Sequence, residues 1–307
     1  MVKNCKIIAV ALAVWPGATA FSFGADGDAV IHAPAGKSEI VITTTKRLAG
    51  AIHSLTWNGK EFINSTDHGR QLQSACSFDN SPTANAETFN PTEAGSRRDH
   101  VGTNSTSRLL ELSASKNHLH TKTQMAFWLA PDERSEGQPA RNTNTLSDYM
   151  LTKDVTIGFE RWPQALDYRV TFSVPTNAHR VSAQFEALTG YMSDEFNAFY
   201  EFDPVTNKLK LLSRGPGEIK NPVVLATADG QFAMGIFSVA PKQPDVRGPS
   251  YGRWFFDWAH VSKWNCVYRI LEPGGIRNGD YNYRMLVPVG TLAQVEAMLA
   301  DWSVMKW

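Results

Sequence analysis

Strict alternation of apolar and polar residues over 165–174 is the feature that most constrains the fold. Apolar side chains would occupy every second position on one face of this segment, and polar side chains would occupy the other face. A period of two residues is typical of a half-buried β-strand, because successive side chains of a strand point to opposite faces. Pro175 would end this strand. The apolar face is formed by Leu166, Tyr168, Val170, Phe172 and Val174.

Strand patterns recur along most of the chain, and helix patterns are scarce. Asn58-Gly59 and Asp229-Gly230 each predict a tight hairpin turn. The best helix candidate is 292–302, where Thr291 and Gln294 fit a capping box. These patterns predict an all-β fold with a short C-terminal helix. Further strands are expected at 39–43, 51–57, 181–188, 222–226, 232–239 and 283–289.

Length and charge narrow the class of protein. The chain has 307 residues, 42% of them hydrophobic, which suffices for one large core and favours a single domain over 21–307. Lys and Arg together number 30 and balance 30 Asp and Glu, so no global field favours nucleic acid or an acidic membrane surface. The 9 Trp residues suit either a sandwich core or stacking against sugar rings.

The first 20 residues have the pattern of a secretory signal peptide. Lys3 and Lys6 form a positive region, 7–15 is a short apolar run, and Ala18-Thr19-Ala20 offers a cleavage site. The run is too short to span a membrane, so no stable membrane span is expected. The pattern predicts a secreted or periplasmic protein, and the alternative is a buried N-terminal strand.

Removal of the signal would leave two cysteines, Cys76 and Cys266. In an oxidising compartment these could form a disulfide. They could equally be two small buried hydrophobic residues. Their spacing does not decide between the two.

Two segments resemble the ends of a known fold. The segment AGAIHSLTWNGKEFIN (49–64) reads as strand, turn and strand, and EPGGIRNGDYNYRMLVPVGTLAQVEAML (272–299) reads as loop, strand and helix. Together they are similar to the galactose mutarotase-like proteins, a superfamily that includes aldose epimerases and domains of polysaccharide-processing enzymes. The resemblance implies a large antiparallel β-supersandwich and a carbohydrate ligand. The epimerase segment Asn-His-x-x-Phe/Tyr-Asn-Leu is absent, so no site residue is transferred.

The segment 67–73 gathers groups that suit a sugar site. His68 could act as general acid or base near neutral pH. Arg70, Gln71 and Gln73 could bind hydroxyls, since each hydroxyl needs a donor or acceptor. A solvated turn would have the same composition.

Three glutamates are candidate catalytic carboxylates. Glu93 lies on a loop between Pro and Gly, and Glu218 follows a Gly-Pro-Gly turn. Glu186 would share one strand face with Gln184, and Tyr191 follows on the same segment. The alternatives are an ordinary polar loop for Glu93, a simple turn for Glu218 and a wet sheet face for Glu186.

Aromatic and polar residues interleave over 251–266, as a carbohydrate cleft requires. An antiparallel strand with one core face would also fit. The candidate substrate-binding residues here are Tyr251, Arg253, Trp254, Lys263 and Trp264.

Metal and cofactor motifs are absent. The sequence has no HExxH, CxxC or GxSxG motif, and nothing in it supports nucleotide binding. His118 and His120 are too few for a structural zinc site. No cofactor is expected, although a calcium site would leave little trace in the sequence.

The leading hypothesis is a secreted enzyme that cleaves a glycosidic bond in a poly- or oligosaccharide. Hydrolysis would use the carboxylates Glu93, Glu186 and Glu218. Elimination from a uronate would use His68, Arg70, Tyr191 and Arg253. The alternatives are an epimerase-like enzyme acting on a free sugar and a non-catalytic carbohydrate-binding protein.

Overall fold

The computed structural model of the chain describes residues 27–79, 87–176, 180–239 and 245–307. The expected signal peptide therefore lies outside the described residues. The described residues are mostly antiparallel strand, with α1 as their single α-helix, which confirms the predicted all-β class. No described helix is long and apolar enough to cross a membrane.

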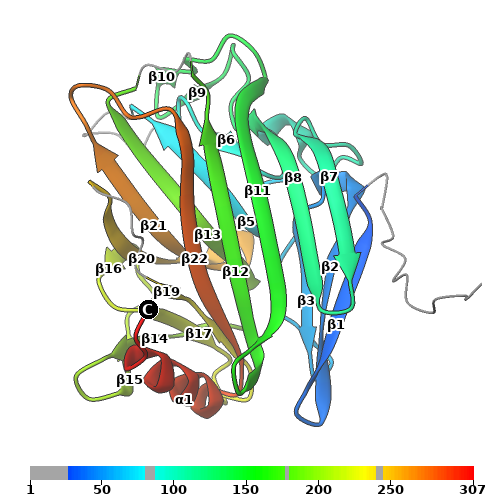
Figure 1. Ribbon diagram of the computed structural model, residues 1–307, viewed down its shortest axis with the longest axis vertical. Helices are drawn as coiled ribbons and strands as arrows, with labels where there is room; N and C mark the ends of the chain where they lie inside the picture. Colours follow the sequence, from blue (N-terminus) through cyan, green and yellow to red (C-terminus); the bar gives the residue numbers. More distant parts are fainter. Residues whose placement is uncertain (1–26, 80–86, 177–179, 240–244) are drawn as a thin grey trace, which may run out of the picture.

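One layer of the molecule faces the viewer in Figure 1. Its strands pair antiparallel in the order β7, β8, β11, β12, β22 and β19. The strands are β7 (Arg108–Ser115), β8 (His118–Phe127), β11 (Leu146–Phe159), β12 (Trp162–Val174), β22 (Gly279–Gly290) and β19 (Phe237–Val239).

The second layer includes the strands that carry the candidate site. Its order is β1, β2, β3, β5, β13, β21, β20 and β16, and all its pairs are antiparallel. The short β6 (Pro91–Thr92) pairs with both β5 and β8 and so links the two layers. The strands are β1 (Ala29–Ala35), β2 (Ser38–Thr44), β3 (Ile52–Trp57), β5 (Leu72–Phe78), β13 (Ser182–Ser193), β21 (Val261–Leu271), β20 (Arg247–Phe256) and β16 (Gly217–Ile219).

A smaller group of strands continues from the end of β22 and packs beside the helix, at the bottom of Figure 1. The helix α1 (Leu292–Ser303) begins with the predicted capping box, because Thr291 accepts from the Gln294 amide and Gln294 bonds back to the Thr291 amide. The strands of this group are β15 (Lys208–Leu212), β14 (Ala198–Asp203), β17 (Val223–Ala226) and β18 (Ala233–Gly235).

The remaining elements are short. The Asn58-Gly59 turn leads into β4, as predicted. These elements are β4 (Lys60–Glu61), β9 (Arg134–Ser135), β10 (Gln138–Pro139) and the 3-10 helices η1 (Lys46–Leu48), η2 (Arg97–Asp99) and η3 (Asp257–Ala259).

Aromatic contacts between the two layers form the core. The Phe185 ring of β13 lies 5.1 Å from the Phe172 ring of β12 and 5.5 Å from the Tyr283 ring of β22. The predicted apolar face of 165–174 is buried at all five of its positions. Burying such faces is the main favourable term for a sandwich of this kind.

One predicted strand is divided in the structure. The segment 232–239 forms β18 and β19, which pair with different parts of β22. Between them, the Ile236 amide donates to Val223 instead. The sequence pattern shows a continuous apolar run, and it contains no sign of this change of partner.

The two described cysteines, Cys76 and Cys266, are free and buried. They lie on β5 and β21, and β13 runs between these strands. Burial raises the pKa of both thiols. Both cysteines therefore act as small core residues, which was one of the two alternatives.

A fully buried ion pair connects β6 to β11. The Lys153 ammonium lies 2.5 Å from Glu93 Oε1, and neither side chain is exposed. The Ser74 amide donates to Glu93 Oε2 at 3.0 Å. Each charge of this enclosed pair needs the other as its counter-charge, because water cannot reach the pair to solvate it.

We expect Glu93→Gln to destabilise the fold by about 3–5 kcal/mol, because the substitution leaves the Lys153 charge buried without a counter-charge. Urea unfolding of the purified variant would measure the loss. The double variant Glu93→Leu/Lys153→Met should recover much of it. Glu111→Gln, in an exposed pair with Lys122, should cost less than about 1 kcal/mol. A loss of the same size in the control would contradict the prediction.

Candidate functional site

Polar side chains line the face of the β5–β13–β21–β20 sheet that points away from the core. Neighbouring strands bring together residues from distant parts of the sequence in rows across this face. One row consists of Gln73, Thr189, Asn265 and Gly252. The next contains Tyr191, Lys263 and Trp254.

A β-bulge in β13 brings Glu186 onto this face. The register with both β5 and β21 shifts between Glu186 and Thr189. In a regular strand these two residues would point to opposite faces, because they are an odd number of positions apart. The extra residue in the bulge restores them to the same side, and bulges commonly re-aim side chains in this way.

The Glu186 carboxylate is held by three neighbours. Oε2 accepts from Thr189 Oγ1 at 2.9 Å and from Asn265 Nδ2 at 3.3 Å, and Lys263 Nζ lies 3.6 Å away. Burial by itself raises the pKa of Glu186, but the Lys263 charge and these hydrogen bonds outweigh it, and the net pKa is lowered. The carboxylate is therefore ionised and remains 24% exposed.

Lys263 is the central charge of the site. Its Nζ lies 4.9 Å from the Trp254 ring centroid and 5.1 Å from that of Tyr191. Burial opposes the charged form, yet Glu186 and Tyr191 raise the pKa of Lys263 above its usual value. Burial also raises the pKa of Tyr191, although Lys263 acts in the opposite direction.

The absence of a side chain at Gly252 leaves space for the Trp254 indole ring. A Cβ at Gly252 would overlap both the Trp254 ring and the Asn265 side chain. The Gly252 amide donates to Asn265 Oδ1 at 3.0 Å, which fixes the orientation of the Asn265 amide group. The Asn265 nitrogen then points to Glu186.

Glu87 supplies a second carboxylate from the loop before β6. Its side chain keeps contact with solvent, and it hydrogen-bonds to Trp128. Desolvation by the surrounding chain raises the pKa of Glu87; the Lys263 charge opposes this effect, and the Glu186 charge adds to it. Glu87 and Glu186 thus interact with the same ammonium but have pKa values shifted in opposite directions. Such a pair can supply one proton donor and one ionised base.

Gln71 and Gln73 face the same side as Tyr191. Each is anchored through its amide nitrogen, Gln71 to the Asp67 carbonyl and Gln73 to the Gly69 carbonyl. Their Oε1 atoms are buried and have no hydrogen-bond partner among the described residues. Gln71 is 0% and Gln73 6% exposed, so these oxygens are enclosed, and the binding of hydroxyls by the two residues stays a prediction.

Two predicted catalytic residues lie in the interior instead. His68 is 1% exposed, and its Nδ1 and Nε2 lie 2.7 Å from the His100 and Arg47 carbonyl oxygens. Both ring nitrogens are therefore occupied by the backbone. Glu93 is sealed against Lys153. Neither residue can reach a substrate, so both assignments are corrected here: these side chains stabilise the fold.

Two predicted aromatic contacts also lie in the core. Trp264 is fully buried and packs over Gly190. Tyr251 is 3% exposed, and its hydroxyl accepts from the Ser238 amide. Both alternate with the site residues along their strands, so they point to the opposite face.

Three other predicted residues reach the surface but are already bound, with Arg70 and Arg253 only partly exposed. Arg253 donates to the Ser213 and Gly217 carbonyls and fixes the loop before β16. Arg70 pairs with Asp67 at 3.1 Å. Glu218 forms a two-bond pair with Arg269 at 2.8 and 2.6 Å. His68, Glu186, Glu218 and Arg253 therefore do not converge on one cleft.

The sequence predictions missed three members of the cluster: Glu87, Thr189 and Asn265. Glu87 lies in the polar stretch 79–104, which is long for a plain connection, but no motif in the sequence singles Glu87 out. Asn265 lies beside Lys263 and Trp264, in a segment that the sequence did single out. Its role depends on Glu186, about 80 residues away, which no local pattern reveals.

The described residues contain no group of three or more His, Cys, Asp or Glu side chains that could hold a metal ion. His118 and His120 do approach one carboxylate, that of Asp154, at 3.4 and 2.8 Å. They lie on the other layer, on β8, away from the site.

Comparison with known proteins gives only remote similarity. No family model matches the chain, and no curated protein does. Among solved structures, a heparan sulfate lyase HepC mutant from Pedobacter heparinus aligns at 10% identity and a TM-score of 0.44, over 87% of this chain and 36% of that one. The Slr1438 protein from Synechocystis sp. PCC 6803 aligns at 9% and 0.43, over 88% and 98%.

A GH36 α-galactosidase, AgaB from Geobacillus stearothermophilus, aligns at 9% identity and a TM-score of 0.44, over 90% of this chain and 42% of that one. This chain thus spans about a third of the lyase and less than half of the galactosidase. Several of these neighbours are carbohydrate-active enzymes, but TM-scores this low establish neither a family nor an activity. The mutarotase-like assignment stays a prediction.

We expect Lys263→Met to raise the pKa of Glu186 and to raise that of Glu87 further, because both carboxylates lose the same positive charge. Carbon-detected NMR titration of labelled glutamate side chains would measure both shifts. Lys122→Met on β8 is the matched control and should move neither pKa. Unchanged titrations in Lys263→Met would show that Lys263 is not the charge coupled to these carboxylates.

Proposed function

We propose that the chain is a secreted carbohydrate-active enzyme that hydrolyses a glycosidic bond in a poly- or oligosaccharide. The observation that carries the proposal is the part-exposed Glu186 carboxylate, which Lys263, Thr189 and Asn265 hold on the sheet face, with the exposed Glu87 carboxylate coupled to the same Lys263 charge. Secretion is part of the proposal and depends on the signal-like residues 1–20. So is a single catalytic domain over 21–307.

The surroundings of the pair suit a sugar. Trp254 and Trp128 provide flat apolar surfaces, on which the C–H face of a pyranose can pack. Thr189 and Asn265, at 2% and 3% exposure, orient the Glu186 carboxylate towards the ligand and do not bind the sugar themselves. A few oriented polar groups beside aromatic surfaces are typical of small-molecule and sugar sites.

In the proposed reaction, Glu87 gives its proton to the glycosidic oxygen as the bond to the anomeric carbon breaks. Glu186 either removes a proton from the attacking water or attacks the anomeric carbon itself. Water supplies the new hydroxyl in both routes, and a proton returns to Glu87. Lys263 keeps Glu186 ionised. The anomer released first would distinguish the two routes.

Elimination is the less favoured chemistry at this site. Tyr191 would be the base, but burial raises the pKa of Tyr191 and so disfavours the tyrosinate. His68, the other candidate base, is enclosed by backbone carbonyls. The carboxylate pair therefore supports hydrolysis better.

An activity screen tests the proposal directly. The mature protein, from about Phe21, would be incubated with neutral and uronic-acid polysaccharides, and reducing ends and ultraviolet absorbance would both be read. New reducing ends without absorbance support hydrolysis. Absorbance from an unsaturated product would indicate a lyase instead. If no polymer is cleaved, the epimerase and sugar-binding alternatives replace the proposal, and anomer interconversion of a free sugar separates those two.

We expect Glu87→Gln and Glu186→Gln each to lower kcat by about 10²–10⁴-fold, the usual contribution of a general acid or base. Glu111→Gln, an exposed glutamate on the other layer, is the control and should keep wild-type activity. Normal stability of the two variants by thermal unfolding would exclude a folding defect. Wild-type rates in both would contradict the assignment.

The pH profile follows from the directions of the two shifts. Glu186 must be ionised, so activity should fall as the pH drops through a pKa below 4.5. Glu87 must be protonated, so activity should fall as the pH rises through a pKa above 4.5. We therefore expect a bell-shaped profile with an acidic optimum. Glu87→Gln should remove the alkaline limb, and a profile that keeps both limbs would contradict its role as acid.

A further inference from the structure

A pocket lies on the same sheet face as Glu186, displaced along the strands from it. Ser250 and Val267 share a row with Glu186, and the next row consists of Arg247, Arg269 and Gln184. The pocket has a volume of about 450 Å³. Its polar lining includes Ser77, Gln184, Arg247, Ser250 and Arg269.

A second register shift brings Arg247 into this pocket. Between Arg247 and Ser250, β20 has one residue more than the facing part of β21. Arg247 therefore points to the same side as Ser250, Gly252 and Trp254. The same device, a bulge, thus orients Glu186 on β13 and Arg247 on β20.

The charges of the pocket are not balanced. Arg269 is bound at 2.6 and 2.8 Å by Glu218 and donates to Gln184 at 2.9 Å. Among the described residues that line the pocket, Asp79 is the one carboxylate; it accepts from the backbone at 181 and 182 and lies 3.5 Å from Arg180. Arg247 has no ion-pair or hydrogen-bond partner for its side chain among the described residues, although it faces Arg269 across the strands. Within the described part of the chain, the exposed Arg247 guanidinium is therefore left without a counter-charge.

We propose that this pocket is a subsite for an acidic sugar unit, with Arg247 binding the carboxylate or sulfate of that unit. The inference rests on the proposed function and narrows its substrate to an acidic polysaccharide. A guanidinium presents two parallel N–H donors, which match the oxygens of such an anion. The hydroxyl of Ser250 lies in the same pocket, at the side nearer to Glu186.

The position of the pocket fits two consecutive units of one chain. The Arg247 row and the Glu186 row are two residues apart along β13, which is about 7 Å. Trp254 lies on the opposite side of Glu186 from Arg247. A polymer lying along the strands would place a ring on Trp254, the cleaved bond near Glu186 and an acidic unit at Arg247.

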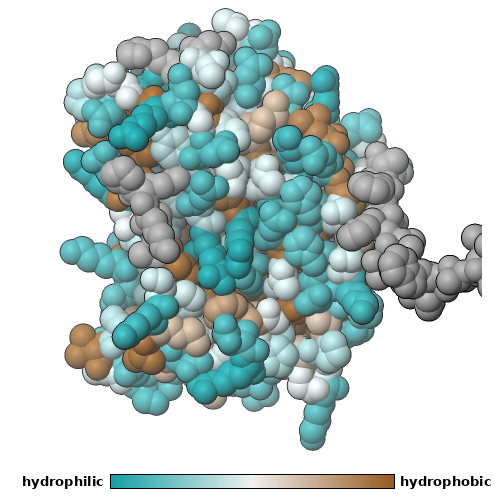
Figure 2. Space-filling view, viewed as in Figure 1, coloured by the Kyte–Doolittle hydropathy of each residue, from teal (hydrophilic) through white to brown (hydrophobic). Residues whose placement is uncertain are grey.

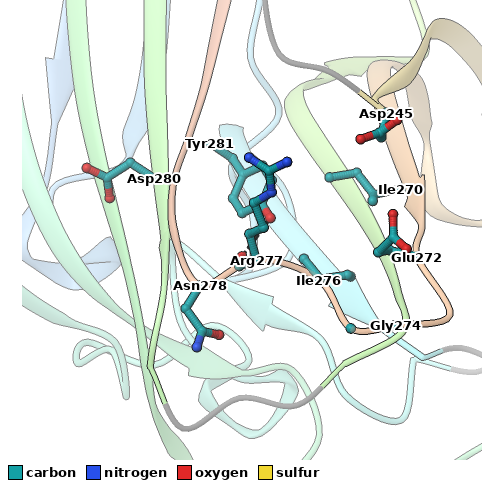
Figure 3. Close-up of a pocket in the computed structure, with 10 residues that line it drawn as sticks. Asp245, Ile270, Glu272, Gly274, Ile276, Arg277, Asn278, Asp280 and Tyr281 are labelled. Carbon is teal, nitrogen blue, oxygen red and sulfur yellow. Dashed lines mark hydrogen bonds between the residues drawn. The ribbon is translucent and has the colours of Figure 1, made fainter.

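The neighbouring pocket in Figure 3 has the opposite character. It shares Ile270 with the Arg247 pocket and is lined by Asp245, Glu272, Asp280 and Arg277. Figure 3 shows Asp245 and Glu272 across the pocket from Arg277, while Asp280 points away. Carboxylates outnumber the guanidinium there, so an anion is favoured in the Arg247 pocket and not in this one.

The test measures binding in Glu87→Gln protein, which should not turn over its ligand. The probes are tetrasaccharides of galacturonic acid, of sulfated galactose and of unmodified galactose, and calorimetry gives each Kd. We expect an acidic probe to bind more tightly than the neutral one. Arg247→Gln should weaken acidic binding by about 10- to 100-fold, the usual effect of a hydrogen-bonded charge, and leave neutral binding unchanged. The preferred acidic probe tells carboxylate from sulfate.

Arg108→Gln is the matched control, because Arg108 is exposed on β7 of the other layer. It should leave every Kd unchanged. Equal binding of all three probes to the Glu87→Gln protein, or equal losses in both arginine variants, would overturn the subsite. Glutamate-dependent cleavage of a neutral polymer would then leave the proposed hydrolysis standing. Arg247-dependent acidic binding without cleavage of any polymer would support the subsite and reject the hydrolysis.

Discussion

One face of strand β13 packs in the core and the other face carries site residues, and the rest of the structure depends on this constraint. Phe185 packs against β12 and β22 and holds the two layers together. On the other face, Glu186 and Tyr191 lie beside the Lys263 ammonium, and Thr189 donates to Glu186. The bulge allows one strand to carry both sets of residues, because it changes the face to which a side chain points without ending the strand. Loss of core packing here would therefore also displace the carboxylate.

Two lysine–glutamate pairs in this protein show how burial decides the role of the same chemistry. Lys153 and Glu93 are fully enclosed, so the pair has no access to a ligand and can only stabilise the fold. Lys263 and Glu186 keep 15% and 24% of their side chains exposed, so a ligand can reach both groups from the surface. The second pair can exchange its contacts for those of a substrate, which the first cannot do without unfolding.

Local patterns in the sequence predicted the elements of the fold, but not the faces on which the site residues lie. Alternation located β12 and its buried side, and the capping box located the start of α1. Gln184 and Glu186 were correctly expected on one side of a strand. The bulge that aligns Glu186 with Tyr191 leaves no local pattern. The sequence placed Glu93 on a loop between Pro and Gly, where a substrate could reach it. Its buried partner Lys153 is 60 residues away in the chain, so no local pattern reveals the pairing. Long-range pairing decided both cases.

A sheet face suits a polymer better than a closed cavity does, because its rows repeat at a fixed spacing. Along the strands this face carries Trp254, then Glu186 two rows further on, and then Arg247 in the row after that, so aromatic, ionised and cationic groups follow one another. A free monosaccharide would contact one row and would leave Arg247 without a ligand. A purely binding groove would need the aromatic and cationic rows, but would have no use for two carboxylates with oppositely shifted pKa values. The proposed cleavage within an acidic chain would use all three positions.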